Sequence, residues 1–176
     1  VISHVYQAPG SFTVNLTIFD NDGFTNSISN TITVVIHDVA VLSVSPSATE
    51  AQAGQQVGIT VRVKNKGTTP ETFNVTIYYN NNKIETQLVQ SLAPNTETTL
   101  TFFWNTTGLA QDSLYTIKAE TSQIEGETNT TDNNSSTSVR IIPQQSPSDF
   151  WGNLQSYAIP IPVSYTHLRA HETVLD

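Results

Sequence analysis

The stretch Val57–Thr68, with the sequence VGITVRVKNKGT, decides the fold. Apolar residues stand at every second position from Val57 to Val63, and polar or small residues lie between them. A period of two predicts a β-strand with one buried face, because successive side chains of a strand point to opposite sides. The turn-forming residues Asn65–Gly67 follow at once and predict the end of the strand.

The same alternation recurs along the chain, and turn-forming residues separate the alternating stretches. These stretches are residues 12–18, 73–79, 100–104 and 115–119. No segment before residue 143 has a sustained helical period. Many short strands separated by turns predict an all-β fold of the sandwich type rather than a parallel sheet.

Composition excludes several classes of function. The net charge of −8 argues against nucleic-acid partners, whose binders need basic patches. The absence of cysteine excludes disulfides and thiol catalysis. Charged residues make up only 12% of the chain, and its polarity comes from 15 Asn and 43 Ser or Thr residues. The many hydroxyl groups lack a recognisable His or Lys base and no glycine-rich phosphate loop occurs, so we expect no enzyme and no cofactor.

Two changes in the sequence divide the chain. Ile36–Asp38 predicts a seam between two units, and the polar, proline-bearing run 143–148 predicts a linker. Residues 38–142 have the length of an immunoglobulin-like sandwich, about 100 residues. We therefore expect this sandwich after a separate unit of residues 1–37.

The first unit carries three recognisable pieces, which are His4–Tyr6, the Ala8–Gly10 turn and Asp20–Gly23 between two strands. Together they resemble the closing half of a PKD domain, an extracellular β-sandwich. The family's opening strands and its Trp-Asp-Phe-Gly-Asp-Gly segment are absent. The resemblance implies that residues 1–37 are the C-terminal fragment of a truncated second β-sandwich.

The middle of the chain resembles the CARDB family, the cell-adhesion-related domains of bacteria and archaea. The matching segments, in order, are Asp38–Ser47, Val57–Thr68, Phe73–Gln87, Ser91–Pro94, Leu100–Trp104 and Glu127–Asn134. The resemblance implies an immunoglobulin-like sandwich that occurs as a repeat in secreted and surface-anchored proteins. It implies no defined ligand.

The C-terminal stretch 164–176, SYTHLRAHETVLD, contains two of the four histidines. His167 and His171 stand four apart, a spacing that suits zinc on a helix. The stretch resembles a translated sequencing-adapter read-through found on the ends of unrelated environmental sequences, and we interpret it as non-native. A zinc site needs a third ligand, and His4 and His37 are too scattered to supply one.

Two oxygen-rich segments are weak calcium candidates. Asp20 and Asp22 offer carboxylates, and the alternative is a tight turn that uses Asp and Gly for its backbone. Glu127 and Asp132 form the second set, and the alternative is a solvated loop between strands. We favour the tight turn at Asp20 and Asp22, and the solvated loop at Glu127 and Asp132.

Six asparagines match the glycosylation pattern Asn-x-Ser/Thr and predict a glycoprotein. They are Asn15, Asn74, Asn105, Asn129, Asn133 and Asn134. Tyr78 and Phe103 point outward by strand parity, and two separate rings do not predict a sugar-stacking platform.

These observations predict a non-catalytic extracellular structural or adhesion module of a prokaryotic cell-surface protein, with an archaeal host expected. Its expected partners are neighbouring β-sandwich domains of the same protein and a cell-surface glycan or protein. The alternative is a glycan-binding accessory module of a secreted hydrolase. Within the linker 143–163, the segment 150–157 contains aromatic residues and precedes an apolar run, residues 158–163. This order predicts the lead-in to a membrane anchor beyond residue 163, and a patch that docks on the sandwich is the alternative.

Overall fold

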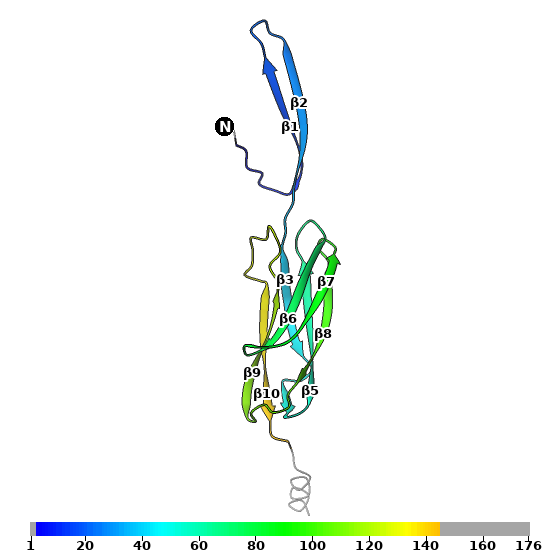
Figure 1. Cartoon of the computed structure of the whole chain (residues 1–176), viewed down its shortest axis with the longest axis vertical. Helices are drawn as coiled ribbons and strands as arrows, with labels where there is room; N and C mark the ends of the chain where they lie inside the picture. The colour runs from blue at the N-terminus through cyan, green and yellow to red at the C-terminus, as the bar shows by residue number, and fades with distance from the viewer. Residues whose placement is uncertain (1–2, 145–176) are drawn as a thin grey trace, which may run out of the picture. The chain divides into compact units, whose positions relative to one another are not determined.

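Figure 1 shows the computed structural model of the chain, which describes residues 3–144. The chain divides after Pro143 into two units, and all the strands of the described part belong to the first. The strands are β1 (Gly10–Phe19), β2 (Thr25–Val34), β3 (Val39–Pro46), β4 (Glu50–Gln52), β5 (Gln56–Asn65), β6 (Glu71–Tyr79), β7 (Asn82–Leu92), β8 (Glu97–Asn105), β9 (Ser113–Thr121) and β10 (Asn134–Ile142). The predicted all-β fold class is confirmed. The expected linker with its anchor lead-in and the C-terminal tail lie outside the described residues.

β1 and β2 form an antiparallel hairpin of their own. Their register places Leu16 opposite Ile28, so apolar side chains from both strands share one face. That face is uncovered, because Leu16 is 62% and Ile28 is 69% exposed. The strands follow the predicted alternation, but the alternation does not mark a buried face here. The interpretation of residues 1–37 as a fragment of a PKD-like domain stays a prediction.

The remaining strands build a β-sandwich. One sheet has five strands in the order β4-β10-β9-β6-β7, and the other has three in the order β3-β5-β8. Neighbouring strands pair antiparallel except β4, which pairs with β10 in parallel. The boundaries 38–142 predicted for this domain remain a prediction.

Inward-facing side chains of both sheets form one apolar core. Val57, Ile59, Val61 and Val63 of β5 are at most 2% exposed, as the alternation in this stretch predicts. The core members are Val39, Val41, Ala51, Val57, Ile59, Val61, Val63, Phe73, Val75, Ile77, Val89, Phe102, Trp104, Ile117, Ala119, Val139 and Ile141. Each large side chain that is removed from water contributes about 1.5–3 kcal/mol to folding. This core stabilises the sandwich without disulfides.

Three aromatic rings pack together between the sheets. The centroid of the buried Trp104 ring lies 5.4 Å from that of Tyr79 and 5.8 Å from that of Tyr115. The Tyr115 hydroxyl accepts a hydrogen bond from the Ala110 amide at 2.9 Å. The inward positions predicted for these aromatics are confirmed, and the packing fixes the loop that precedes β9.

Candidate functional site

The segment between β2 and β3 is clamped to the loop that follows β5. The Asp38 carbonyl accepts hydrogen bonds from the amides of Lys66, at 2.8 Å, and Gly67, at 3.1 Å. The Ile36 carbonyl accepts one from the Thr68 amide at 2.9 Å, and the Ile36 amide donates to Thr68 Oγ1 at 2.9 Å. The residues of the predicted seam are therefore hydrogen-bonded to the sandwich. We call these four hydrogen bonds the seam clamp.

Gly67 makes the seam clamp possible. A Cβ atom at this position would lie 2.5 Å from the Ile36 carbonyl oxygen and 3.2 Å from the Asp38 nitrogen. Only glycine lets the two backbone segments approach this closely. The glycine read in the sequence as a turn residue therefore has a second role in packing.

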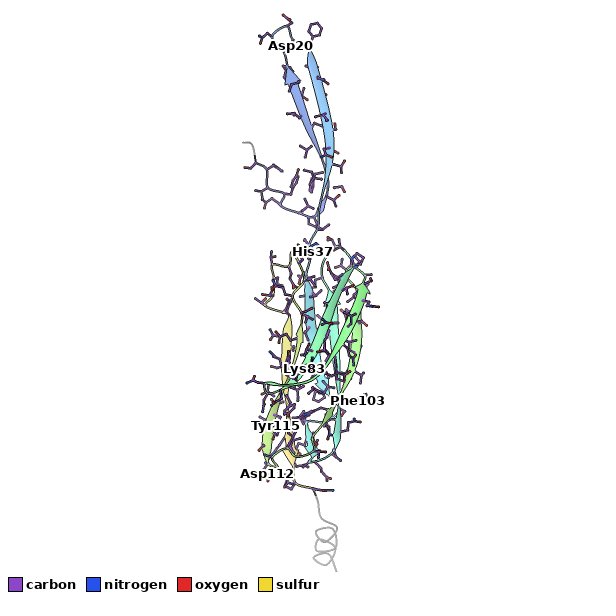
Figure 2. All side chains as sticks on the ribbon, viewed as in Figure 1. Asp20, His37, Lys83, Phe103, Asp112 and Tyr115 are labelled. Carbon is purple, nitrogen blue, oxygen red and sulfur yellow. The ribbon has the colours of Figure 1, made fainter. Side chains whose placement is uncertain are left out.

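A partly buried contact between a histidine and a carboxylate lies beside the seam clamp. His37 Nδ1 is 2.7 Å from Glu71 Oε1, and Thr69 Oγ1 donates to the same oxygen at 2.9 Å. Glu71 is only 7% exposed, and Figure 2 shows His37 where the chain enters the sandwich. This pair is not among the candidate sites predicted from the sequence. Strand parity could have indicated it, because Glu71 has the same parity as Phe73 and therefore faces inward.

Glu127 belongs to the interior of the sandwich. It is 6% exposed, so the expected solvated loop is wrong at this residue. Its Oε1 accepts a hydrogen bond from the Val39 amide at 2.9 Å. Its Oε2 accepts one from the Ile124 amide at 3.2 Å and one from Asn133 Nδ2 at 2.9 Å. The carboxylate ties the loop between β9 and β10 to the first residue of β3.

Asp132 and Asp38 lie near this carboxylate, together with one lysine. Lys66 Nζ is 2.5 Å from Asp132 Oδ2, and this hydrogen bond raises the pKa of Lys66. Burial raises the pKa of Asp38, and the negative charge of Asp132 adds to the shift while Lys66 opposes it. The buried Oδ1 atom of Asp38 has no hydrogen-bond partner among the described residues. The result is a local excess of negative charge that one ammonium group partly offsets.

Asp20 forms a tight turn between β1 and β2. Its Oδ1 accepts hydrogen bonds from the amides of Asp22, at 3.0 Å, and Phe24, at 2.8 Å. Side-chain acceptors of this kind stabilise Asx turns, so the turn interpretation is confirmed. Calcium binding at Asp20 and Asp22, or at Glu127 and Asp132, stays a prediction.

The described residues contain no group of three or more His, Asp or Glu side chains placed to hold a metal ion. The two histidines of the tail, His167 and His171, lie outside the described part of the chain. Within residues 3–144 there is also no helix with the length and apolarity that a membrane crossing requires.

The structure separates the six glycosylation candidates into two groups. Asn133 is 6% exposed and its amide is engaged by Glu127, so the folded protein does not offer it to a glycosyltransferase. The exposed candidates are Asn15, Asn74, Asn105, Asn129 and Asn134. Modification of these five stays a prediction.

The outward aromatics lie on different sheets. Phe103 is 57% exposed on β8 of the three-stranded sheet, whereas Tyr78 lies on β6 of the five-stranded sheet. The structure therefore brings no two of these rings together, in agreement with the sequence. Beside Tyr78, however, the outer face of the five-stranded sheet has a polar groove that the sequence analysis did not detect.

The fold and these contacts define a class of protein: an all-β sandwich module whose polar side chains mainly fix the loops at its ends. The CARDB family matches residues 34–137, which is more than half of the chain. The chain belongs to the CARDB family.

Solved structures share the fold. The CARDB domain of a Pyrococcus furiosus protein, crystallised in complex with di-metal ions, is 24% identical with a TM-score of 0.54. The match covers 62% of this chain and 96% of that one. A domain from Methanosarcina acetivorans, described as part of a cell-surface protein, is 23% identical with a TM-score of 0.50, and the match covers 62% and 96% of the two chains. The comparison with curated proteins found no match.

Proposed function

We propose that residues 38–142 act as a non-catalytic structural and adhesion module of an extracellular protein at a prokaryotic, specifically archaeal, cell surface. The observation that carries this proposal is the seam clamp. Four hydrogen bonds hold the segment that enters the sandwich against the loop after β5. A module that spaces other domains needs a fixed entry of this kind, since a free linker would not transmit orientation.

The rest of the sandwich supports the same role. Its interior is filled by apolar side chains from both sheets, and the buried carboxylates Glu71 and Glu127 bind to neighbouring loops. Such polar groups at the ends of a sandwich favour a rigid unit. The partners we propose are adjacent β-sandwich domains of the same protein, and a surface glycan or protein for adhesion.

The relatives support the location. Both domains named above come from archaea, and one is described as part of a cell-surface protein. The di-metal complex of the Pyrococcus domain is the reason to keep calcium at Glu127 and Asp132 as a proposal. A cation there would have to displace Lys66 from Asp132 and compete with the three N–H donors that already bind the Glu127 carboxylate. An anchor beyond residue 163 remains part of the proposal.

Protease treatment of intact cells that produce the full-length protein tests the location. Peptides from residues 38–142 should be released without lysis, and mass spectrometry of the same peptides reports glycans on the exposed asparagines. Release only after lysis contradicts the proposal. The alternative, an accessory module of a secreted hydrolase, requires a catalytic domain in the same full-length gene, whereas tandem β-sandwiches favour the spacing role.

A further inference from the structure

The outer face of the five-stranded sheet has a groove of about 370 Å³ that runs over β6, β7 and β9. Its main lining side chains are Asn74, Thr76, Tyr78, Lys83, Thr86 and Glu120. The volume is within the range of small-ligand sites, about 300–1,000 Å³. The lining is polar except for one ring, which distinguishes it from the apolar pockets that take drug-like molecules.

The strand register brings these side chains together. Thr76 of β6 stands opposite Thr86 of β7 on one side and opposite Glu120 of β9 on the other. Residues in register on adjacent strands share a face, so the three side chains form a row across the sheet. The Thr76 and Thr86 hydroxyl oxygens are 2.9 Å apart. This pair forms a fixed hydroxyl floor.

The ring of Tyr78 lies beside this row, because Tyr78 follows Thr76 by two residues on β6 and shares its face of the sheet. Lys118 Nζ lies 5.1 Å from its centroid, and the same ammonium is 2.8 Å from Glu120 Oε2. A cation over the ring and a carboxylate on that cation restrict the orientation of all three groups. Tyr78 pairs with Lys83 of β7, after a register shift at Ile77. This pairing places a second ammonium group, that of Lys83, near the ring.

The chemistry of the lining selects a class of ligand. Hydroxyl and carboxamide groups both donate and accept hydrogen bonds, and Glu120 adds acceptors while Lys83 adds donors. An apolar ligand would leave these groups unpaired, at a cost in affinity. A phosphate would favour net positive charge, but Glu120 offsets Lys118 and only one further ammonium lines the groove. A polyhydroxylated ring that hydrogen-bonds at its rim and stacks its C–H face on an aromatic ring satisfies the whole set.

We propose that this groove binds one saccharide unit of a glycan. The proposal does not depend on the spacing role, but it rests on the adhesion part of the proposed function, for which it names the site and the ligand class. Only one outward ring lies on the described part of this sheet, so there is no aromatic platform. In this proposal the hydroxyl floor takes the place of a second ring.

A glycan array tests the proposal with the full 176-residue chain. The chain is produced in a host without N-glycosylation, so that Asn74 carries no sugar. The array holds neutral hexose, N-acetylhexosamine and hexuronate oligomers. We expect binding to at least one of these classes, and the NMR signals of Thr76 and Thr86 should shift when that oligomer is titrated into the chain.

Two variants with matched controls locate the site. Tyr78→Ala should weaken binding roughly tenfold through loss of ring stacking, and Thr86→Val should weaken it through loss of one hydroxyl. Leu114→Ala and Thr116→Val are the controls, since both residues are exposed on the outer face of β9 away from the groove lining. Both controls should bind as the unmodified chain does.

Four results decide the outcome. Absence of binding to every class at millimolar oligomer overturns the proposal, as does binding that survives both Tyr78→Ala and Thr86→Val. If Tyr78→Ala does not fold, then Tyr78→Phe, which keeps the ring, must bind normally while Thr86→Val binds weakly. Binding restricted to hexuronates and abolished by Lys83→Ala supports the proposal and identifies the saccharide as acidic.

Discussion

The substitution Gly67→Ala adds one methyl group at the point where the chain enters the sandwich. The new Cβ would lie 2.5 Å from the Ile36 carbonyl oxygen and 3.1 Å from Asn65 Oδ1. The Ile36 oxygen belongs to the backbone, so it cannot move aside as the end of a flexible side chain would. The segment 36–38 must therefore shift away from the loop after β5.

The structure sets the size of the effect. Detachment of this segment breaks the four hydrogen bonds of the seam clamp. At a net contribution of about 0.5–1 kcal/mol each, their loss lowers the free energy of unfolding by about 2–4 kcal/mol. That is a large part of the stability of a typical domain, about 5–15 kcal/mol.

Urea unfolding followed by circular dichroism measures this loss in the full chain. Gly58→Ala is the matched control, because a Cβ there meets only Ser47 atoms at 3.8 Å and should leave the midpoint almost unchanged. Hydrogen exchange adds a local readout, since the Thr68 amide should lose protection only in Gly67→Ala. Equal midpoints for the two variants, with unchanged protection of Thr68, would refute the reasoning about the seam clamp.

Four further predictions concern stability. Glu127→Gln should cost about 2–4 kcal/mol in urea unfolding, because the amide keeps one oxygen acceptor while its NH₂ would face at least one of the three N–H donors that now bind the carboxylate; the exposed Glu125→Gln should cost almost nothing. Burial raises the pKa of Asp38, so its ionised form destabilises the fold once the pH is above that pKa. Asp38→Asn should therefore raise the urea midpoint at pH 7 and lose this advantage as the pH falls below the ordinary aspartate value; an equal gain at pH 3 contradicts the assignment. Amides of residues 1–37 should exchange faster than those of 38–142, since the hairpin has an uncovered apolar face; equal protection would show another source of stability. Millimolar calcium should raise the melting temperature by at most about 2 °C and zinc should leave it unchanged; a zinc shift of several degrees would restore the metal-site interpretation of the tail.

Alternation in the sequence predicts the inside and outside of β5 and β6. Val57 to Val63 and Phe73 to Ile77 are buried at alternate positions, as their parity requires. Parity does not say which strands are neighbours. The parallel pairing of β4 with β10 could not be predicted, because three residues, Glu50–Gln52, are too short to show a period. For the hairpin of β1 and β2, alternation predicts a buried face that the structure does not show, because no second layer covers it.

Of the polar contacts at the ends of the sandwich, strand parity can predict some but not others. Glu127 accepts a hydrogen bond from the Val39 amide, which is far away in the sequence, and nothing local distinguishes it from a solvated loop glutamate. Asn65 and Glu71 are different, because each stands at an inward position by strand parity and both are buried. Asn65 Nδ2 donates to two backbone carbonyls, those of Thr69 and Leu92, at 2.7 and 2.8 Å.

A polar residue at an inward position must find partners or destabilise the fold. At the end of a strand, the available partners are the backbone groups and side chains of adjacent loops. Polar residues with inward parity at strand ends therefore indicate loops that are fixed rather than mobile. In this chain they surround the seam clamp, so the segment that a spacing module most needs to hold is the one that the buried polar residues fix.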